Sequence, residues 1–144
     1  MVTQNIDGLH QKAGSKKVYE IHGSALRNYC SKCGMEYPED YIFESKEPVP
    51  HCEKCGGVVR ADITLYEESL PDDAVSNAVK AIAAADMLII GGTSLTVYPA
   101  AGFVNYFRGK NLVVINRDPL NVRIGEKVLM IQQSIGEVFS QLKA

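Results

Sequence analysis

The stretch from residue 87 to residue 103 constrains the fold more than any other part of the sequence. It begins with Met-Leu-Ile-Ile, an apolar run typical of a strand buried on both faces in a parallel sheet. Gly91 and Gly92 then permit a tight turn and a close approach of the backbone to a ligand. Thr93 and Ser94 can cap a following helix, whose free N–H groups favour an anion such as phosphate. On its own the stretch is equally compatible with a strand, turn and helix that bind nothing.

The surrounding sequence predicts an α/β fold. The expected elements are a helix from Pro71 to Ala83, a helix over residues 98–107, strands over residues 112–116 and 128–131, and a last helix capped by Ser134. This alternation of helices and strands indicates a doubly wound parallel sheet with right-handed crossovers. Because ligands bind beyond the carboxyl ends of such strands, we expect residues 92–94 and 116–118 at one edge of the sheet.

Two cysteine pairs predict a metal site. Cys30 and Cys33 form one Cys-x-x-Cys motif, and Cys52 and Cys55 form a second after eighteen intervening residues. Four thiolates at this spacing suit a tetrahedral zinc ion with no position left for water, so the expected role is structural. Redox chemistry or another metal stays the alternative. His51 is a substitute ligand by residue type, but four sulfurs already complete the shell.

Composition excludes several classes of partner. The chain has 144 residues and a net charge of −2, so it offers no electrostatic argument for binding nucleic acid. No apolar run approaches the ~20 residues of a membrane helix, and no signal peptide opens the sequence. We therefore expect a cytoplasmic protein without a membrane or nucleic-acid partner.

Five motifs, taken in order, resemble the sirtuins, which are NAD-dependent protein-lysine deacylases. They are Thr-Gln-Asn-Ile-Asp-Gly-Leu-His at residues 3–10, Glu-Ile-His-Gly at 20–23, the two cysteine pairs, Gly-Thr-Ser-Leu-Thr-Val-Tyr-Pro-Ala at 92–100, and Ile-Asn at 115–116. The resemblance implies a Rossmann-like NAD-binding part over residues 1–27 and 58–144. It implies a small zinc-ribbon module over residues 28–57, with an acyl-lysine protein or peptide entering between the two.

The resemblance also implies roles for individual residues. His22 matches the catalytic base, and Cys30, Cys33, Cys52 and Cys55 match the zinc ligands. The residues matching the cofactor site are Gln4, Asn5, Ile6 and Asp7 around the nicotinamide and its ribose, Gly92, Thr93 and Ser94 at the phosphates and ribose, and Asn116, Arg117, Asp118 and Ile135 at the adenosine. The residues matching the strand that pairs with substrate are Ile63, Thr64, Leu65 and Tyr66.

Histidine suits the base role because its unperturbed pKa of about 6.5 lets it accept a proton at neutral pH. His22 follows a short strand expected over residues 18–21 and precedes a glycine, which places it well to face a cleft. His10 competes by residue type. It follows a tight polar turn, so we expect it to have a structural role.

The sequence departs from the family pattern in two places. The pattern Arg-Pro-x-Val-Val-x-Phe-Gly-Glu is replaced at residues 60–68 by Arg-Ala-Asp-Ile-Thr-Leu-Tyr-Glu-Glu, so that Glu67 stands in place of a glycine. The family's opening strand, its Gly-Ala-Gly-x-Ser loop and its Asp-Phe-Arg segment do not occur in this sequence. We therefore expect weak NAD binding by this chain alone and an unpaired sheet edge, covered either by dimerisation or within a longer protein.

Three interpretations follow. The first is an NAD-dependent deacylase that releases nicotinamide and O-acyl-ADP-ribose. The second is a non-catalytic sirtuin remnant that binds zinc and has weak or no NAD binding. A zinc-ribbon nucleic-acid module is a distant third, because the acidic residues of the insert oppose it.

Overall fold

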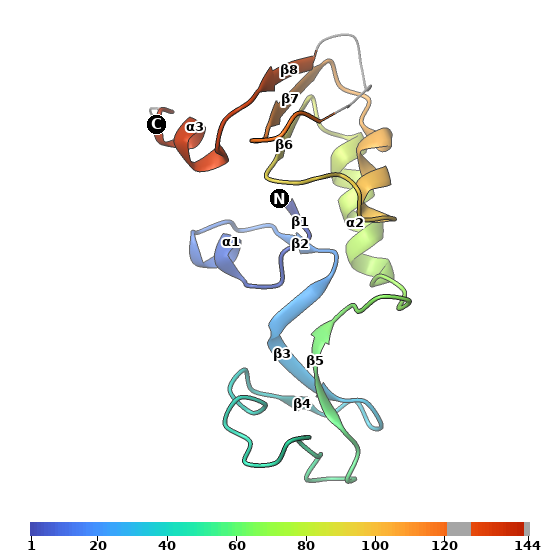
Figure 1. Ribbon diagram of the computed structural model, residues 1–144. Coiled ribbons are helices and arrows are strands. Elements are labelled where there is room, and N and C mark those ends of the chain that lie inside the picture. The colour runs from blue at the N-terminus through green and yellow to red at the C-terminus, as the bar shows by residue number, and fades with distance from the viewer. Residues whose placement is uncertain (121–127, 143–144) are drawn as a thin grey trace. The chain divides into compact units, whose positions relative to one another are not determined.

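The computed structural model describes residues 1–120 and 128–142 (Figure 1). The chain divides into two compact units, Met1–Val75 and Ser76–Ala144. Each unit has its own sheets and its own buried residues, so each is described by itself.

In the first unit, a small parallel sheet precedes a larger antiparallel one. β1 (Val2–Thr3) pairs in parallel with β2 (Tyr19–Glu20), and the short helix α1 (Leu9–Lys12) lies between them in the chain. The strand expected over residues 18–21 is thereby confirmed, with Ile21 2% exposed directly after it.

The antiparallel sheet holds the cysteine-bearing segment. Its order is β4 (Glu36–Tyr37), β3 (Gly23–Cys30) and β5 (Val59–Ile63). The β3–β5 register shifts between Ser24 and Asn28, where β3 is irregular. A small buried cluster of Cys30, Tyr37, Cys52 and Val59 lies at the cysteine end of this sheet. Such a small cluster contains little apolar area, so a metal would supply part of the folding free energy here.

The second unit contains the predicted parallel sheet. The strands β6 (Met87–Gly91), β7 (Asn111–Ile115) and β8 (Val128–Ile131) run parallel in the order β6-β7-β8, side by side in Figure 1. The central strand is the most buried, with Leu112 2% and Val114 0% exposed. The sequence has the apolar, β-branched residues that such a strand needs.

The helices α2 (Asp72–Ala83) and α3 (Ile135–Ser140) complete the α/β pattern. Ala78 and Ile82 are buried one turn apart on α2, as the helical spacing of its apolar residues predicts. Ser134 occupies the N-cap position of α3, although its hydroxyl makes no capping hydrogen bond.

Two expectations for residues 87–107 are wrong. A helix is present within residues 98–107, as the 3₁₀ helix Ala100–Tyr106, but its N-cap is Pro99 and not Thr93 or Ser94. Thr93 and Ser94 lie too far upstream to cap it, and instead Thr93 Oγ1 accepts a bond from the Leu95 N–H at 3.1 Å. The intervening loop separates the glycine turn from the N-terminus of this 3₁₀ helix.

The strand β6 is also not buried on both faces. Met87 is 48% and Ile89 49% exposed, whereas Ile90 on the opposite face is 7% exposed. Ile89 pairs in register with Val113, and Val113 pairs with Leu129, so these three residues share one face of the sheet. Leu129 is also exposed, at 57%, so within residues 1–120 and 128–142 this face is sparsely covered, whereas burial of a parallel strand on both faces requires that both faces be covered.

Candidate active site and metal centre

His22 lies where the parallel sheet of the first unit gives way to the antiparallel one. The backbone turns sharply at Gly23, whose φ is +76°, and a Cβ there would lie 2.0 Å from the Asp62 carbonyl oxygen. Only glycine permits this approach of β3 to β5. The pairing of histidine with glycine in the sequence therefore has a steric cause.

A backbone carbonyl orients the His22 ring. Nδ1 lies 3.1 Å from the Gln4 carbonyl oxygen, and because a carbonyl only accepts, Nδ1 carries the hydrogen and donates it. Nε2 is then the nitrogen with a free lone pair, as a general base requires. The Thr64 N–H donates to the His22 carbonyl at 3.0 Å, which ties the residue after β5 to the histidine.

A cavity of about 510 Å³ brings the predicted residues of the first unit together. It is lined by Gln4, Asn5, Ile6, Asp7, His22, Ile63, Thr64 and Leu65. Residues 4–7, called the polar loop below, contribute four of these. Local hydrogen bonds hold this loop, since the Asn5 N–H donates to Thr3 Oγ1 at 3.1 Å and the Leu9 N–H donates to Asp7 Oδ1 at 3.0 Å. Tyr66 is 93% exposed and, like His10, is not among the lining residues.

A second cavity, of about 570 Å³, lies at the carboxyl ends of the parallel strands. It is lined by Gly92, Thr93, Ser94, Ile115, Asn116, Arg117, Asp118, Pro119, Leu120, Gln133, Ser134 and Ile135. All seven residues expected at the phosphate and adenosine positions are in this set. The parallel register of β6, β7 and β8 causes this, because it places the residues after all three strands at one edge.

Close packing shapes this second cavity. A Cβ on Gly91 would lie 2.2 Å from Ile135 Cδ1, so the glycine lets the start of α3 approach the end of β6. Gly92 has φ +60° and open space around the position of a Cβ, and its N–H donates to the Ile115 carbonyl at 3.1 Å. The side-chain amide of Asn116 donates to the Asp118 carbonyl at 2.9 Å, which holds the loop after β7.

Sequence reasoning missed part of this lining. Gln133 and Ser134 follow β8 as Asn116 follows β7, so applying the strand-end rule to the third strand would have found them.

The four cysteines form a cluster that could hold a metal ion. Their sulfur atoms lie within 4.8 Å of one another, with Cys30 Sγ 3.5 Å from Cys55 Sγ and Cys33 Sγ 3.6 Å from Cys52 Sγ. These separations fit four ligands around one zinc ion, for which Zn–S is about 2.3 Å. His51 is outside the cluster, its Nδ1 3.3 Å from Glu47 Oε2.

The surroundings of Cys30 and Cys52 favour their thiolate forms, whereas the neighbouring sulfur of Cys33 helps to raise the pKa of the Cys55 thiol, to about 12. The Lys32 N–H donates to Cys30 Sγ at 3.4 Å, and the Tyr37 hydroxyl beside Cys52 lowers the pKa of that thiol to about 6. Because thiolates are the ligands of zinc, both contacts prepare the site for a metal.

Comparison with known proteins identifies the class. The model of the Sir2 family matches residues 1–99, and the chain belongs to this family. Its relatives include the NAD-dependent protein deacetylase of Clostridium perfringens, 57% identical over 99% of this chain and 58% of that protein. The enzyme of the same name in Clostridium acetobutylicum is 54% identical over 96% of this chain and 56% of that protein.

Solved Sir2 structures share the fold. A structure of Sir2 with a p53 peptide and NAD⁺ has a TM-score of 0.86 and 36% identity, and covers 97% of this chain and 60% of that one. A structure with 2′-O-acetyl-ADP-ribose and deacetylated p53 peptide has the same TM-score at 35% identity. The chain thus spans little more than half the length of the relatives that it matches.

Proposed function

We propose that this protein is an NAD-dependent protein-lysine deacylase, which releases nicotinamide and O-acyl-ADP-ribose. The observation that carries the proposal is the first cavity, where an oriented histidine shares one space with the polar loop and with the segment after β5. Relatives that are 54–57% identical are named NAD-dependent protein deacetylases, which supports the same reaction.

The residues present fit the cofactor. Gly92, directly after β6, has open space beside its backbone, and the second cavity groups the seven residues proposed to hold the phosphates and adenosine. Gln4, Asn5, Ile6 and Asp7 are proposed to hold the nicotinamide end. Bound there, NAD would supply an electrophilic ribose carbon for the acyl oxygen, with nicotinamide as the leaving group.

His22 is the proposed catalytic residue. With Nδ1–H held by the Gln4 carbonyl, Nε2 can accept a proton from a substrate hydroxyl presented in the cavity. Residues 63–66 are the proposed binding segment for the acyl-lysine peptide. Thr64 connects the peptide-binding segment to the proposed base, because its N–H donates to the His22 carbonyl.

The proposed domain division follows the motifs. Residues 1–27 and 58–144 form the NAD-binding part, and residues 28–57 form the module stapled by one zinc ion. No helix of the described residues is long and apolar enough to cross a membrane. A cytoplasmic location stays a prediction, supported by four unpaired thiols gathered for metal.

We also propose that a second copy of the chain covers the exposed edge at β6. Met87 and Ile89 support this, because two half-exposed apolar side chains stand on one face of that strand.

A turnover assay with NAD and an acetyl-lysine peptide tests the function. His22→Ala should lower kcat by about 10²–10⁴-fold, the usual contribution of a general base. His10→Ala is the matched control, since His10 is absent from the cavity lining and should leave kcat unchanged. A wild-type protein that binds zinc but neither binds NAD nor turns over peptide would support the non-catalytic alternative instead.

A further inference from the structure

We propose that Arg60 and Glu68 form a brace that positions residues 63–66 for the substrate peptide. Neither residue lines the cavity, so each is a positioning residue and not a catalytic one. The proposal rests on the proposed function for the identity of the peptide, and on the geometry of the brace for everything else.

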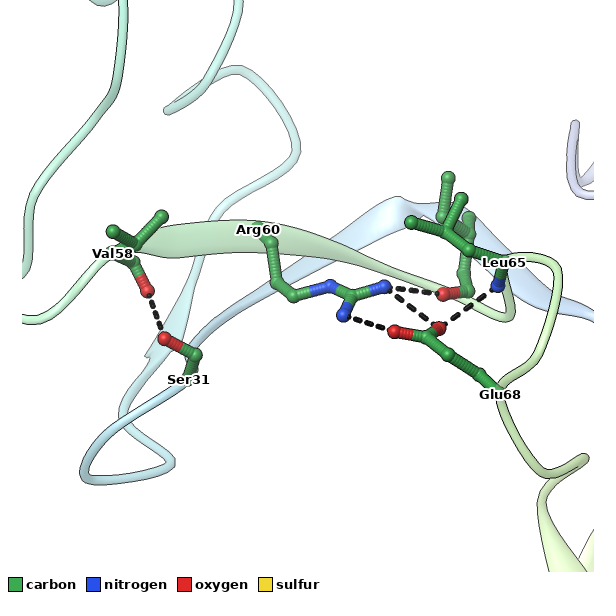
Figure 2. Close-up of polar contacts among 6 residues, drawn as sticks. Ser31, Val58, Arg60, Leu65 and Glu68 are labelled. Atoms are coloured by element: carbon green, nitrogen blue, oxygen red, sulfur yellow. Dashed lines mark hydrogen bonds and ion pairs between the residues drawn. The ribbon is translucent and has the colours of Figure 1, made fainter.

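The brace is a two-pronged ion pair. Arg60 Nη1 donates to Glu68 Oε1 at 2.6 Å and Nη2 donates to Glu68 Oε2 at 3.0 Å, as Figure 2 shows. The Arg60 side chain is 30% exposed and the Glu68 side chain 39% exposed. The Arg60 guanidinium and the Leu65 N–H hold the pKa of the Glu68 carboxyl down, to about 2, so it is charged at neutral pH.

Both partners of the ion pair also bind the backbone between them. Arg60 Nη2 donates to the Ile63 carbonyl at 3.0 Å, and Glu68 Oε2 accepts from the Leu65 N–H at 2.8 Å (Figure 2). The Thr64 N–H, between these two groups, donates to the His22 carbonyl. Three successive backbone groups are therefore held, one of them by the residue that carries the proposed base.

The exposure of the side chains on this fixed backbone indicates that the segment binds a ligand. Leu65 is 54% and Tyr66 93% exposed, although both are large and apolar in part. An ordered backbone that presents exposed apolar side chains is what an extended peptide can bind without first ordering the segment.

Local sequence preference does not hold the segment by itself. The Glu68 N–H donates to the Leu65 carbonyl at 3.2 Å, which closes a turn in which Glu67 has φ +71°. A positive φ at this third turn position is typical of a type II turn, which favours glycine. Because Glu67 resists this conformation, the side-chain brace is what keeps the turn closed.

An exposed ion pair alone would be weak, since most such pairs contribute little to stability. Arg27 provides the comparison on the same sheet. It donates to Glu20 Oε2 at 2.8 Å and to Asp62 Oδ2 at 2.9 Å, and both of these are side-chain contacts. Arg27→Gln is therefore the matched control, because it removes ion pairs of β3 without touching the backbone of residues 63–68.

The test uses the full protein with Glu68→Gln, Arg60→Lys and Arg27→Gln. Hydrogen–deuterium exchange of the peptide covering residues 63–68 reports the brace, and peptide KM and kcat at saturating NAD report its effect. Both brace variants should exchange faster and raise peptide KM about tenfold with kcat little changed, since a mobile segment must be ordered on binding. Arg27→Gln should change neither exchange nor KM.

The outcomes separate this proposal from the proposed function. An active wild type whose brace variants keep the wild-type peptide KM, or lose kcat instead, overturns the brace alone. A wild type that neither binds nor turns over acyl-lysine peptides overturns the proposed function, and with it the substrate role of the brace. Arg60→Lys keeps the positive charge and loses the two-pronged geometry of the guanidinium, so this variant still tests the brace if Glu68→Gln fails to fold.

Discussion

At the scale of single residues, Glu67 stores conformational strain. Its φ of +71° falls in the left-handed region, which costs a non-glycine residue about 1–2 kcal/mol. Glu67→Gly should remove that cost, offset in part by about 0.4–1 kcal/mol from the more flexible unfolded chain. We expect a net stabilisation of about 0.5–1 kcal/mol, measured by urea unfolding.

Glu67→Ala is the control for this change. It removes the carboxylate and keeps a Cβ, so it should leave the free energy of unfolding near the wild-type value. Equal stabilisation by alanine and glycine would show that charge, and not backbone strain, is the cause.

Single residues differ in how far their contacts could be predicted from the sequence. The gathering of Cys30, Cys33, Cys52 and Cys55 was predictable because the spacing of the two Cys-x-x-Cys pairs favours a tetrahedral metal site, and their sulfur atoms do lie within 4.8 Å of one another. The pairing of Arg60 with Glu68 was not, because it depends on the turn that brings residues eight apart in the chain to 2.6 Å.

At the scale of elements, the sheet of β3, β4 and β5 should depend on zinc. Its buried cluster contains two of the cysteines, and thiolates without a metal would repel one another there. Chelation, or Cys52→Ser, should abolish the circular-dichroism and exchange signatures of this sheet, and native mass spectrometry should find one zinc per folded chain.

Ser31→Ala is the matched control beside the metal site. Ser31 Oγ donates to the Val58 carbonyl at 3.0 Å (Figure 2), so its loss should cost about 1 kcal/mol and leave the zinc bound. A sheet that survives chelation with its exchange protection intact would contradict a structural role for the metal.

The type of an element could be predicted where the periodicity of its apolar side chains decides between helix types and strands. It could not be predicted where that periodicity fits two types. The strands β6, β7 and β8 follow from apolar runs, and α2 follows from apolar residues spaced at i and i+4. The apolar positions of Ala100–Tyr106 suit one face of an α-helix or a 3₁₀ helix alike, so periodicity could not choose between them.

At the scale of the whole molecule, the parallel order of β6, β7 and β8 was predictable from the alternation of helices and strands. The burial of each strand was not, because it depends on what packs over each face of the sheet. The same apolar run that predicts a core strand becomes an exposed surface when one face of the sheet is sparsely covered.

The exposed face of β6 should make the chain self-associate. Met87 and Ile89 are each about half exposed, and burying such side chains against a second copy is favourable at roughly 25 cal/mol per Å² of apolar surface. Light scattering after size-exclusion chromatography should give a mass that rises with protein concentration toward a dimer, and Ile89→Lys should return it to the monomer. Phe43→Lys, at a 78% exposed apolar residue outside that sheet, should leave the association unchanged. A monomer across the whole concentration series, or equal effects of the two lysine variants, would exclude β6 as the interface.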